Sequence, residues 1–266
     1  MRTTRWGMTA ILALLLFGCA GIDTAPTPEA RQALAPTGKL RVAFLSAPIY
    51  ATKDPATGEL KGIAVDLGRD LARRVGVPFE PVPYPNPPAL IGGAKSGAWD
   101  VALMGINAER AMAMDFSAPY MEVEQGYLVR AGVSIATASD VDKAGIRIGV
   151  LEKSGADLYL SSTVKNAALV RIKSLAENYA LLDTGKADVI AATKTALFAG
   201  AASRPGSRVL DSRILVEPIG MGVPKGRDSA AAAYVGKFVE EAKAQGLVKS
   251  AIERAGLRGV VVAPMK

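Results

Sequence analysis

The residue of this chain best suited to recognising a small molecule is an arginine in the stretch GINAERAMAMDFSAPY, residues 105–120. Small residues flank Arg110, so its guanidinium has room for a partner. The planar fork of a guanidinium binds both oxygens of a carboxylate at once. The stretch therefore predicts a carboxylate clamp at Arg110. A salt bridge at the surface or between two lobes is the alternative role for the same side chain.

The composition excludes most catalytic and metal-binding arrangements. The sequence has no histidine and one cysteine, so it offers no Ser-His-Asp triad and no imidazole metal ligand. It has no Walker loop, and GIAVDLG at residues 62–68 does not supply the glycine fingerprint of a dinucleotide site. We therefore expect a binding protein rather than an enzyme, with no cofactor and no metal ion. Acid–base chemistry by carboxylates and lysines stays open.

The charge distribution argues against nucleic acid as a partner. The formal net charge is +7, but the lysines and arginines are scattered singly between acids, without a basic stripe or interleaved aromatic residues. We expect no nucleic-acid binding. A mild attraction for anions or for an anionic membrane surface remains compatible with this charge.

The N-terminus carries an export signal. A short basic region precedes nine apolar residues, AILALLLFG, which are too few to span a bilayer but suit a signal peptide over residues 1–18. The following Cys19 completes a stretch, LFGC, that resembles the lipobox of bacterial lipoproteins. Because a lone cysteine cannot form an internal disulfide, we expect acylation of Cys19, for example by palmitate, and anchoring to a membrane. The alternative is an ordinary secreted protein with a chance cysteine.

Beyond the cysteine, residues 19–37 are small, polar and proline-containing, and predict a lipidated tether. From residue 38 onward strands and helices alternate. The expected strands are 39–45, 77–84, 101–106, 127–132, 146–151, 168–174 and 187–193, and the expected helices are 63–76, 87–99, 175–185 and two between 229 and 256. This order predicts an α/β fold with two mainly parallel sheets flanked by helices.

The alternation of strands and helices is interrupted once and then begins again, which divides the folded part into two lobes. We expect lobe 1 over residues 38–128, lobe 2 over residues 129–216, and a return to lobe 1 with C-terminal helices over residues 217–266. Two such lobes leave a ligand cleft where their strand ends meet.

Several motifs then occur in a characteristic order: TGKLRVAFL, GELKGIAVDLGRDLARRVGV, ALIGGAKSGAWDVALMGINAERAMAMDFSAPY, IGVLEKSG and LLDTGKADVIAAT. Together they resemble the solute-binding domain family that serves amino-acid-type ABC transporters, family 3 of bacterial extracellular solute-binding proteins. The resemblance covers about residues 39–194, and the terminal helices also fit. It implies a two-lobed periplasmic-binding-protein fold of type II. It also implies an exported monomer, in the periplasm or cell envelope, that hands its solute to an ABC permease in the inner membrane.

The resemblance also implies the binding residues of lobe 1. In the family, the arginine of the E-R motif, here Arg110, grips the ligand carboxylate. The preceding turn, LMGIN, is expected to line the cleft through Leu103, Gly105 and Ile106. Family members often have serine, glycine or threonine where this chain has Leu103 and Gly105. Hydroxyl donors are therefore lost there, and Leu103 makes that wall apolar.

Further ligand contacts are expected from loops and from lobe 2. Tyr50 is the candidate for an aromatic wall, with a partly exposed loop tyrosine as the alternative, and Asn86 lies where the next loop enters the cleft. Ser154 and Gly155 should stand at a helix N-terminus, where free amides favour an anionic group. An ordinary N-cap is compatible with that role for Ser154.

One departure from the family pattern bears on the ligand. Amino-acid binders have an aspartate after the second-lobe strand, which pairs with the ligand ammonium, whereas this chain has Thr193 there, with Lys194 beside it. A hydroxyl cannot neutralise a buried cation. We therefore expect a small carboxylate-bearing solute other than a standard α-amino acid. Alternatively, Glu122 or Glu124 supplies the missing negative charge.

The expected mechanism is hinge closure around the ligand, with hinges near residues 127–131 and 215–218 and a ligand bridging Arg110 and the Ser154/Thr193 side. Two alternatives are kept. One is a periplasmic enzyme similar to cyclohexadienyl dehydratases, and the other is a ligand sensor domain.

Overall fold

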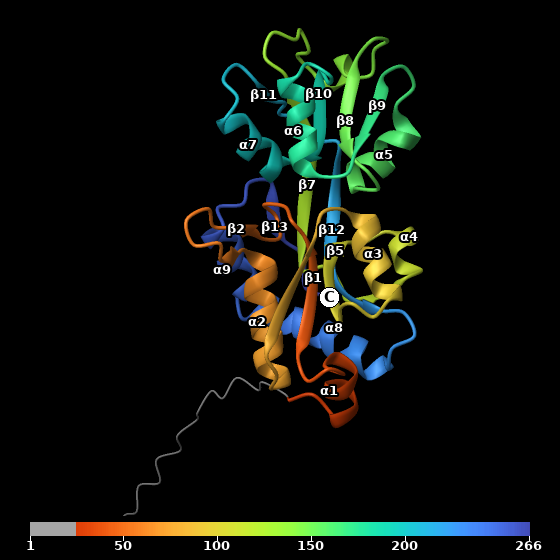
Figure 1. Ribbon diagram of the computed structural model, residues 1–266, viewed down its shortest axis with the longest axis vertical. Helices are drawn as coiled ribbons and strands as arrows, with labels where there is room; N and C mark the ends of the chain where they lie inside the picture. The colour runs from red at the N-terminus through yellow and green to blue at the C-terminus, as the bar shows by residue number, and fades with distance from the viewer. Residues whose placement is uncertain (1–24) are drawn as a thin grey trace, which may run out of the picture.

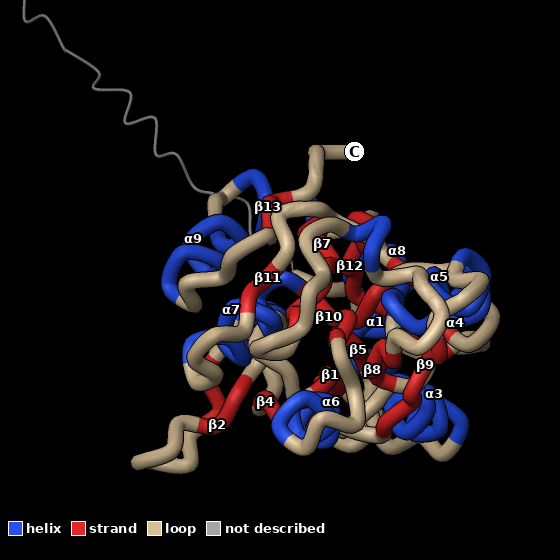
Figure 2. The backbone as a smooth tube through the Cα atoms, turned by 90° about the horizontal axis from the view of Figure 1, so that it is seen from above, coloured by secondary structure: helices blue, strands red, loops and turns tan. Residues whose placement is uncertain are grey.

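Two long antiparallel strands, β7 (Met121–Val129) and β12 (Leu215–Pro224), run through the molecule and join its two lobes (Figure 1). The structure is a computed structural model that describes residues 25–266. In Figure 2 the strands gather towards the middle of the molecule and the helices lie around them. The α/β class and the two lobes predicted from the sequence are confirmed.

Lobe 1 consists of the N-terminal half of the described chain and its C-terminal return. Its helices are α1 (Pro28–Leu34), α2 (Ile63–Val75), α3 (Pro87–Lys95), α4 (Ala108–Ala111), α8 (Ser229–Ala244) and α9 (Leu247–Arg254). Its shorter strands are β1 (Leu40–Leu45), β2 (Thr52–Lys53), β3 (Leu60–Lys61), β4 (Phe79–Tyr84), β5 (Val101–Gly105), β6 (Met114–Phe116) and β13 (Val260–Val262). The amphipathic helix α2 ends, as the sequence predicts, at Gly76, whose φ of 74° suits glycine.

Lobe 2 is the upper lobe in Figure 1. Its helices are α5 (Gly155–Thr163), α6 (Leu175–Asp183), α7 (Lys194–Ala202) and a short 3-10 helix (Ala138–Asp140). Its strands are β8 (Arg147–Leu151), β9 (Ala168–Ile172), β10 (Val189–Thr193) and β11 (Arg208–Val209). No helix among the described residues is long and apolar enough to cross a bilayer.

The strands of both lobes belong to one curled sheet. Among the described residues this sheet has eleven strands, with β4-β1-β5-β12-β7-β10-β8-β9 as its main path. Neighbours pair in parallel at the outer parts of each lobe, β4-β1-β5 and β10-β8-β9, and antiparallel where β12 and β7 cross between the lobes. The sheet is therefore continuous through the crossing between the lobes rather than split into the two sheets that the sequence predicted.

The first crossing between the lobes lies slightly earlier in the chain than predicted. Gln125 of β7 pairs with Leu215 of β12 on one side and with Thr193 of β10 on the other. Val123 packs in the core of lobe 1, whereas Tyr127 packs in the core of lobe 2. The boundary therefore lies at Gln125 rather than after residue 128, because β7 changes partner there.

The C-terminal part of the expected tether over residues 19–37 is folded, because it contains helix α1. Thr27 caps helix α1, with its hydroxyl accepting a hydrogen bond from the amide of Ala30, and Pro28 starts the helix. Leu34 is fully buried in the core of lobe 1, and α1 packs against α8. The predicted signal peptide and Cys19 lie outside the described residues.

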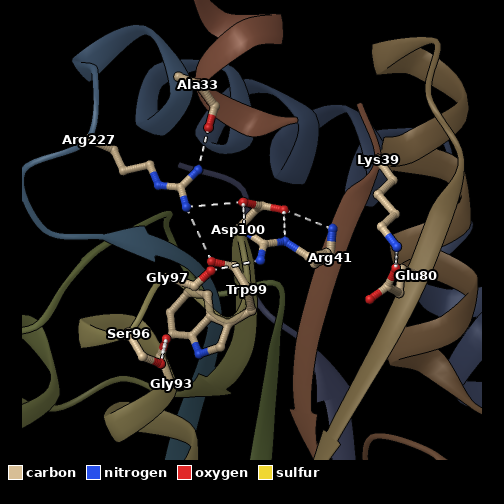
Figure 3. Close-up of polar contacts among 10 residues, drawn as sticks. All are labelled: Ala33, Lys39, Arg41, Glu80, Gly93, Ser96, Gly97, Trp99, Asp100 and Arg227. Atoms are coloured by element: carbon tan, nitrogen blue, oxygen red, sulfur yellow. Dashed lines mark hydrogen bonds and ion pairs between the residues drawn. The ribbon is translucent and has the colours of Figure 1, made fainter. Parts of the chain in front are cut away.

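A buried aspartate fixes the same strand junction in each lobe. In lobe 1, Asp100 precedes β5 and accepts hydrogen bonds from the main-chain amide of Arg41 and from its guanidinium, at 2.8–3.0 Å (Figure 3). Arg227 forms an ion pair with the same carboxylate at 3.0 Å. In lobe 2, Asp188 precedes β10 and binds the amide and guanidinium of Arg147 in the same way. Each aspartate therefore holds two neighbouring parallel strands in register.

Candidate functional site

The candidate site is a cavity between the lobes, next to the crossing strands. Its volume is about 70 Å³, whereas pockets for small ligands usually measure about 300–1,000 Å³. The apolar part of its wall consists of Leu45, Ala47, Ile49, Pro87, Leu151, Leu175, Ala191, Ala192 and Ala196. The remaining wall residues are Tyr50, Arg110, Gln125, Ser154, Gly155, Asn178, Thr193 and Glu217. Five predicted site residues thus meet at one cavity: Tyr50, Arg110, Ser154, Gly155 and Thr193.

Arg110 lies at the centre of this site. The short helix α4 positions it, and Asn107 caps that helix by accepting a hydrogen bond from the Arg110 amide at 2.9 Å. The side chain of Arg110 is buried, with the whole residue 3% exposed. This burial excludes the alternative of a surface salt bridge.

The guanidinium of Arg110 contacts both lobes and the crossing strand β12. Its Nη1 donates to the carbonyl of Gly105 at 2.8 Å and to Oε1 of Glu217 at 3.1 Å. Its Nη2 donates to the carbonyl of Lys153 in lobe 2 at 2.9 Å. Arg110 therefore contacts the other lobe in this structure. An interlobe contact of this arginine was the alternative to the carboxylate clamp in the sequence analysis.

Lys153 offers its carbonyl through an unusual backbone conformation. Its φ is 57°, in the left-handed region that non-glycine residues rarely adopt. Its own amide donates to Oδ2 of Asp157 at 2.8 Å, which holds the turn into helix α5. Such strain, roughly 1–3 kcal/mol, is often found where a backbone group must be aimed at a binding site.

Glu217 brings a second charge into the cavity, and sequence reasoning missed it. It lies on β12, and the whole residue is 8% exposed. Besides accepting from Arg110, its Oε2 accepts a hydrogen bond from Nε2 of Gln125 at 2.6 Å. Two glycines make room for this carboxylate. A Cβ added to Gly105 would lie 1.9 Å from Oε1 of Glu217, and one added to Gly155 would lie 2.6 Å from its Cδ.

Tyr50 is a buried part of the wall, with 3% of the residue exposed, which excludes the alternative of a partly exposed loop residue. Burial raises the pKa of Tyr50 well above its ordinary value, and the negative charge of Glu217 raises this pKa further. The positive charge of Arg110 acts in the opposite direction on the same pKa. Tyr50, Arg110 and Glu217 therefore form one electrostatic cluster.

Lobe 2 contributes two helix starts to the cavity. Ser154 is the N-cap of α5 and accepts from the amide of Asp157 at 3.2 Å, and Gly155 is the first residue of this helix. Thr193 is the N-cap of α7 and accepts from the amide of Ala196 at 3.3 Å. Both helices begin at the cavity, so their first amides make it favourable for negative charge.

Four predicted residues are not part of the described cavity wall. Leu103 is fully buried in the core of lobe 1, so its side chain does not form the expected apolar wall of the cleft. Gly105 contributes its carbonyl to Arg110, and the amide of Ile106 donates to the carbonyl of Pro218. Asn86 caps α3 and donates across the cleft to the carbonyl of Lys173 at 3.0 Å. These residues frame the site from outside the cavity.

The acids considered as substitutes for the missing aspartate lie elsewhere. Glu124 forms an ion pair with Lys194 at 2.9 Å and another with Arg213 at 3.6 Å, and the hydrogen bond from Lys194 lowers the pKa of Glu124. Lys194 is thereby also directed away from the described cavity. Glu122 pairs with Pro218 in the sheet and is not part of the cavity wall. The acid of the cavity is Glu217.

Asn178 is a further polar wall residue that the sequence did not reveal. It is fully buried in α6, and neither atom of its side-chain amide has a hydrogen-bond partner. An unpaired buried amide costs roughly 1–3 kcal/mol. A polar group of a ligand would supply the missing partner.

Direct contacts outside the cavity wall also join the lobes. Lys153 of lobe 2 forms an ion pair with Glu109 of lobe 1 at 3.4 Å. The hydroxyl of Thr195 donates to the carbonyl of Arg258 at 2.7 Å, and the guanidinium of Arg258 stacks over Phe198. The structure therefore shows the lobes closed on each other.

A larger hollow, of about 670 Å³, lies between α2, α9 and α7 at the rim of the lobes. Charged residues in its wall are partnered: Lys61 with Asp54, and Arg254 with Asp66. The cavity between the lobes instead contains the buried ion pair of Arg110 and Glu217 and the unpaired side-chain amide of Asn178. We therefore take this cavity as the candidate site. No group of three or more metal-ligating side chains is positioned for a metal among residues 25–266.

The sequence and the fold of this chain are similar to those of known proteins. The family model of bacterial extracellular solute-binding proteins, family 3, matches residues 40–255. The chain is similar to the ABC transporter glutamine-binding protein GlnH of Bacillus subtilis (strain 168). The two are 24% identical over 203 residues, covering 74% of this chain and 73% of GlnH.

Two solved structures show the same fold. One is a P235GK mutant of ArgBP from T. maritima, with a TM-score of 0.76 and 24% identity over 85% of this chain and 99% of that one. The other is an ancestral amino acid-binding protein, AncCDT-1, described as a precursor of cyclohexadienyl dehydratase. Its TM-score is 0.73, with 24% identity over 85% of this chain and 98% of that one.

Proposed function

The chain belongs to the bacterial extracellular solute-binding proteins, family 3, and from this premise we propose that it captures a small carboxylate-bearing solute between its lobes for an ABC permease. The family serves amino-acid ABC transporters, which gives the general class of solute. The observation that carries the proposal is the position of Arg110. Its guanidinium is buried at the cavity, in contact with both lobes and the hinge strand β12.

The mechanism is closure about the crossing strands. Lobe 1 presents Arg110 and Tyr50 to the cavity, and lobe 2 presents Ser154, Gly155 and Thr193. A solute that contacts both sets stabilises the closed arrangement over an open one, because only the closed form makes both sets of contacts. The small volume of the cavity means that a solute needs the lobes to open, or the carboxylate of Glu217 to move, before it can enter.

We propose binding without catalysis. Among the described residues that line the cavity, Glu217 is the carboxylic acid, and its two oxygens accept from Arg110 and Gln125. Both oxygens of this acid thus have partners within the protein, whereas a dehydratase needs an acid that contacts the leaving hydroxyl. Turnover of prephenate by the purified protein would support the enzyme alternative. Association with a histidine kinase rather than with a permease would support the sensor alternative.

A screen of ligands by thermal unfolding tests the proposed function. Amino acids, their hydroxy- and keto-acid counterparts and dicarboxylates are each added to the purified protein. A solute that binds the folded state raises the melting temperature as its concentration rises above its Kd. We expect at least one carboxylate to raise it, and amides or alcohols of the same carbon skeleton to have no effect. If the neutral amide raises it as much as the acid does, the carboxylate site is refuted.

We further propose that the protein is exported as a monomer and held to a membrane by lipid on Cys19. The proposal rests on the LFGC stretch and on the absence of a second cysteine in the sequence. Cells producing the protein and fed radiolabelled palmitate should label the wild type and not Cys19→Ser. Equal labelling of the two proteins would contradict the anchor.

A further inference from the structure

The carboxylate of Glu217 lies where the carboxylate of a solute would have to bind. It accepts from Nη1 of Arg110 and lies against Gly155, the first residue of helix α5. Gln125, on the neighbouring hinge strand β7, holds its other oxygen at 2.6 Å. A side chain of the protein thus fills the position that the guanidinium and the helix N-terminus would offer to an anion.

For a solute to bind Arg110, Glu217 must therefore give up its contact. The Nη1 atom of Arg110 is shared between Glu217 and the carbonyl of Gly105, and its Nη2 is engaged by Lys153 of lobe 2. Opening of the lobes releases Nη2, since Lys153 moves with lobe 2. Displacement of Glu217 releases Nη1. Binding is then an exchange of one carboxylate for another at the same guanidinium.

The charges of the cavity decide which solutes can make this exchange. Among the described residues of the cavity wall, Arg110 and Glu217 carry full charges, so the site is neutral as a whole. A carboxylate without an amine would pair with Arg110 and leave Glu217 buried without a cation, which is costly. A solute that also carries an ammonium provides Glu217 with a new partner and keeps the site neutral.

The presence of Glu217 in the cavity changes which solute we expect to bind. The sequence predicted a solute other than a standard α-amino acid, because Thr193 stands where amino-acid binders have an aspartate. The cavity does hold an acid, but it comes from the hinge strand β12 rather than from the end of β10. The hydroxyl of Thr193 caps its own helix.

We propose that Glu217 determines the specificity of this site: it occupies the clamp of Arg110 and yields it to solutes that carry an ammonium near their carboxylate. This inference rests on the proposed function, because it assumes a carboxylate at Arg110. Glu217 thereby excludes simple monocarboxylates and becomes the binding partner of the ligand amine. The direct contact between Arg110 and Glu217, 3.1 Å, favours solutes whose two charges are separated by few bonds, such as α-amino acids.

Matched pairs of ligands test this role by isothermal titration calorimetry. The probes are α-amino acids and the α-hydroxy acids that differ from them in the amine alone, for example alanine and lactate. We expect the wild type to bind the preferred amino acid at least about tenfold more tightly than its hydroxy acid. In Glu217→Gln the cavity carries a net positive charge, so the preference should reverse in favour of the hydroxy acid. A gain of binding of this kind cannot arise from a folding defect.

Two further variants complete the test. Glu122→Gln, on the neighbouring strand and outside the cavity wall, should retain the wild-type preference. Glu217→Asp keeps the charge in a shorter side chain and should also retain the order of preference, even where Glu217→Gln folds poorly. The inference fails if the wild type binds the hydroxy acid as tightly as the amino acid, or if Glu217→Gln keeps the wild-type preference. If no acid of either class binds the wild type, the proposed function fails as well.

Discussion

Replacing Arg110 by glutamine is expected to weaken solute binding by roughly 30- to 5,000-fold, the equivalent of about 2–5 kcal/mol. The guanidinium is 3% exposed as part of its residue, so the carboxylate it binds is shielded from water. Without it, the carboxylate of the solute would be buried beside the carboxylate of Glu217 and would lack its own cation. The binding free energy lost therefore exceeds the contribution of the missing hydrogen bonds alone, because the carboxylate of the solute stays buried without its partner.

Calorimetric titration of the best solute from the ligand screen measures this effect. Arg69→Gln is the matched control, since Arg69 lies on the exposed face of α2 and pairs with Glu59 at 3.5 Å. It should bind like the wild type. Arg110→Lys keeps the charge but loses the planar fork, and should recover part of the affinity. An Arg110→Gln protein that binds within twofold of the wild type would show that the solute does not contact this residue.

Replacing Asp100 by asparagine is expected to lower the free energy of unfolding by about 3 kcal/mol, the cost of breaking a buried ion pair. The carboxylate is fully buried and is bound by two guanidinium groups, those of Arg41 and Arg227 (Figure 3). It also accepts from the main-chain amide of Arg41, which fixes β1 beside β5. The substitution replaces the carboxylate by a neutral amide beside the guanidinium groups of Arg41 and Arg227. Through these two arginines, Asp100 links strand β1 to the C-terminal part of lobe 1.

Urea unfolding followed by circular dichroism measures this change. Asp115→Asn is the control, because Asp115 pairs with Lys225 at the surface, where an ion pair contributes at most about 1 kcal/mol. Equal losses in the two variants would contradict the structural role of Asp100. Because Asp100 lies in lobe 1 away from the cavity wall, the solute affinity of the folded Asp100→Asn protein should stay close to that of the wild type.

Much of the fold could be predicted because its elements carry local signals. The helix from Ile63 to Val75 has apolar residues at helical spacing and ends at a glycine, and the predicted strands of both lobes are present. Helix α1 was missed although its own start signal is present. Thr27 followed by Pro28 and Glu29 is a cap, a first-turn proline and a first-turn acid. The proline-rich composition of the segment outweighed that signal.

The site could be predicted where a motif positions its residues, as with Arg110, Ser154 and Gly155. It could not be predicted where partners come from distant parts of the chain. Glu217 lies 107 residues from Arg110, and their contact depends on the register of β12 against β7. One sequence signal was available, since Glu217 is an acid inside the apolar run ILVEPIGMGVP. A buried acid in a strand requires a partner, and Arg110 is that partner.

The most direct test of a carboxylate clamp is nuclear magnetic resonance of the protein with ¹⁵N-labelled arginine and a solute ¹³C-labelled at its carboxylate. Comparison with Arg110→Lys assigns the guanidinium signals of Arg110. We predict a correlation between the carboxylate carbon and the nitrogens of Arg110, together with slowed exchange of its guanidinium protons. Unchanged Arg110 signals under saturating solute that still raises the melting temperature would place the solute elsewhere and contradict the clamp.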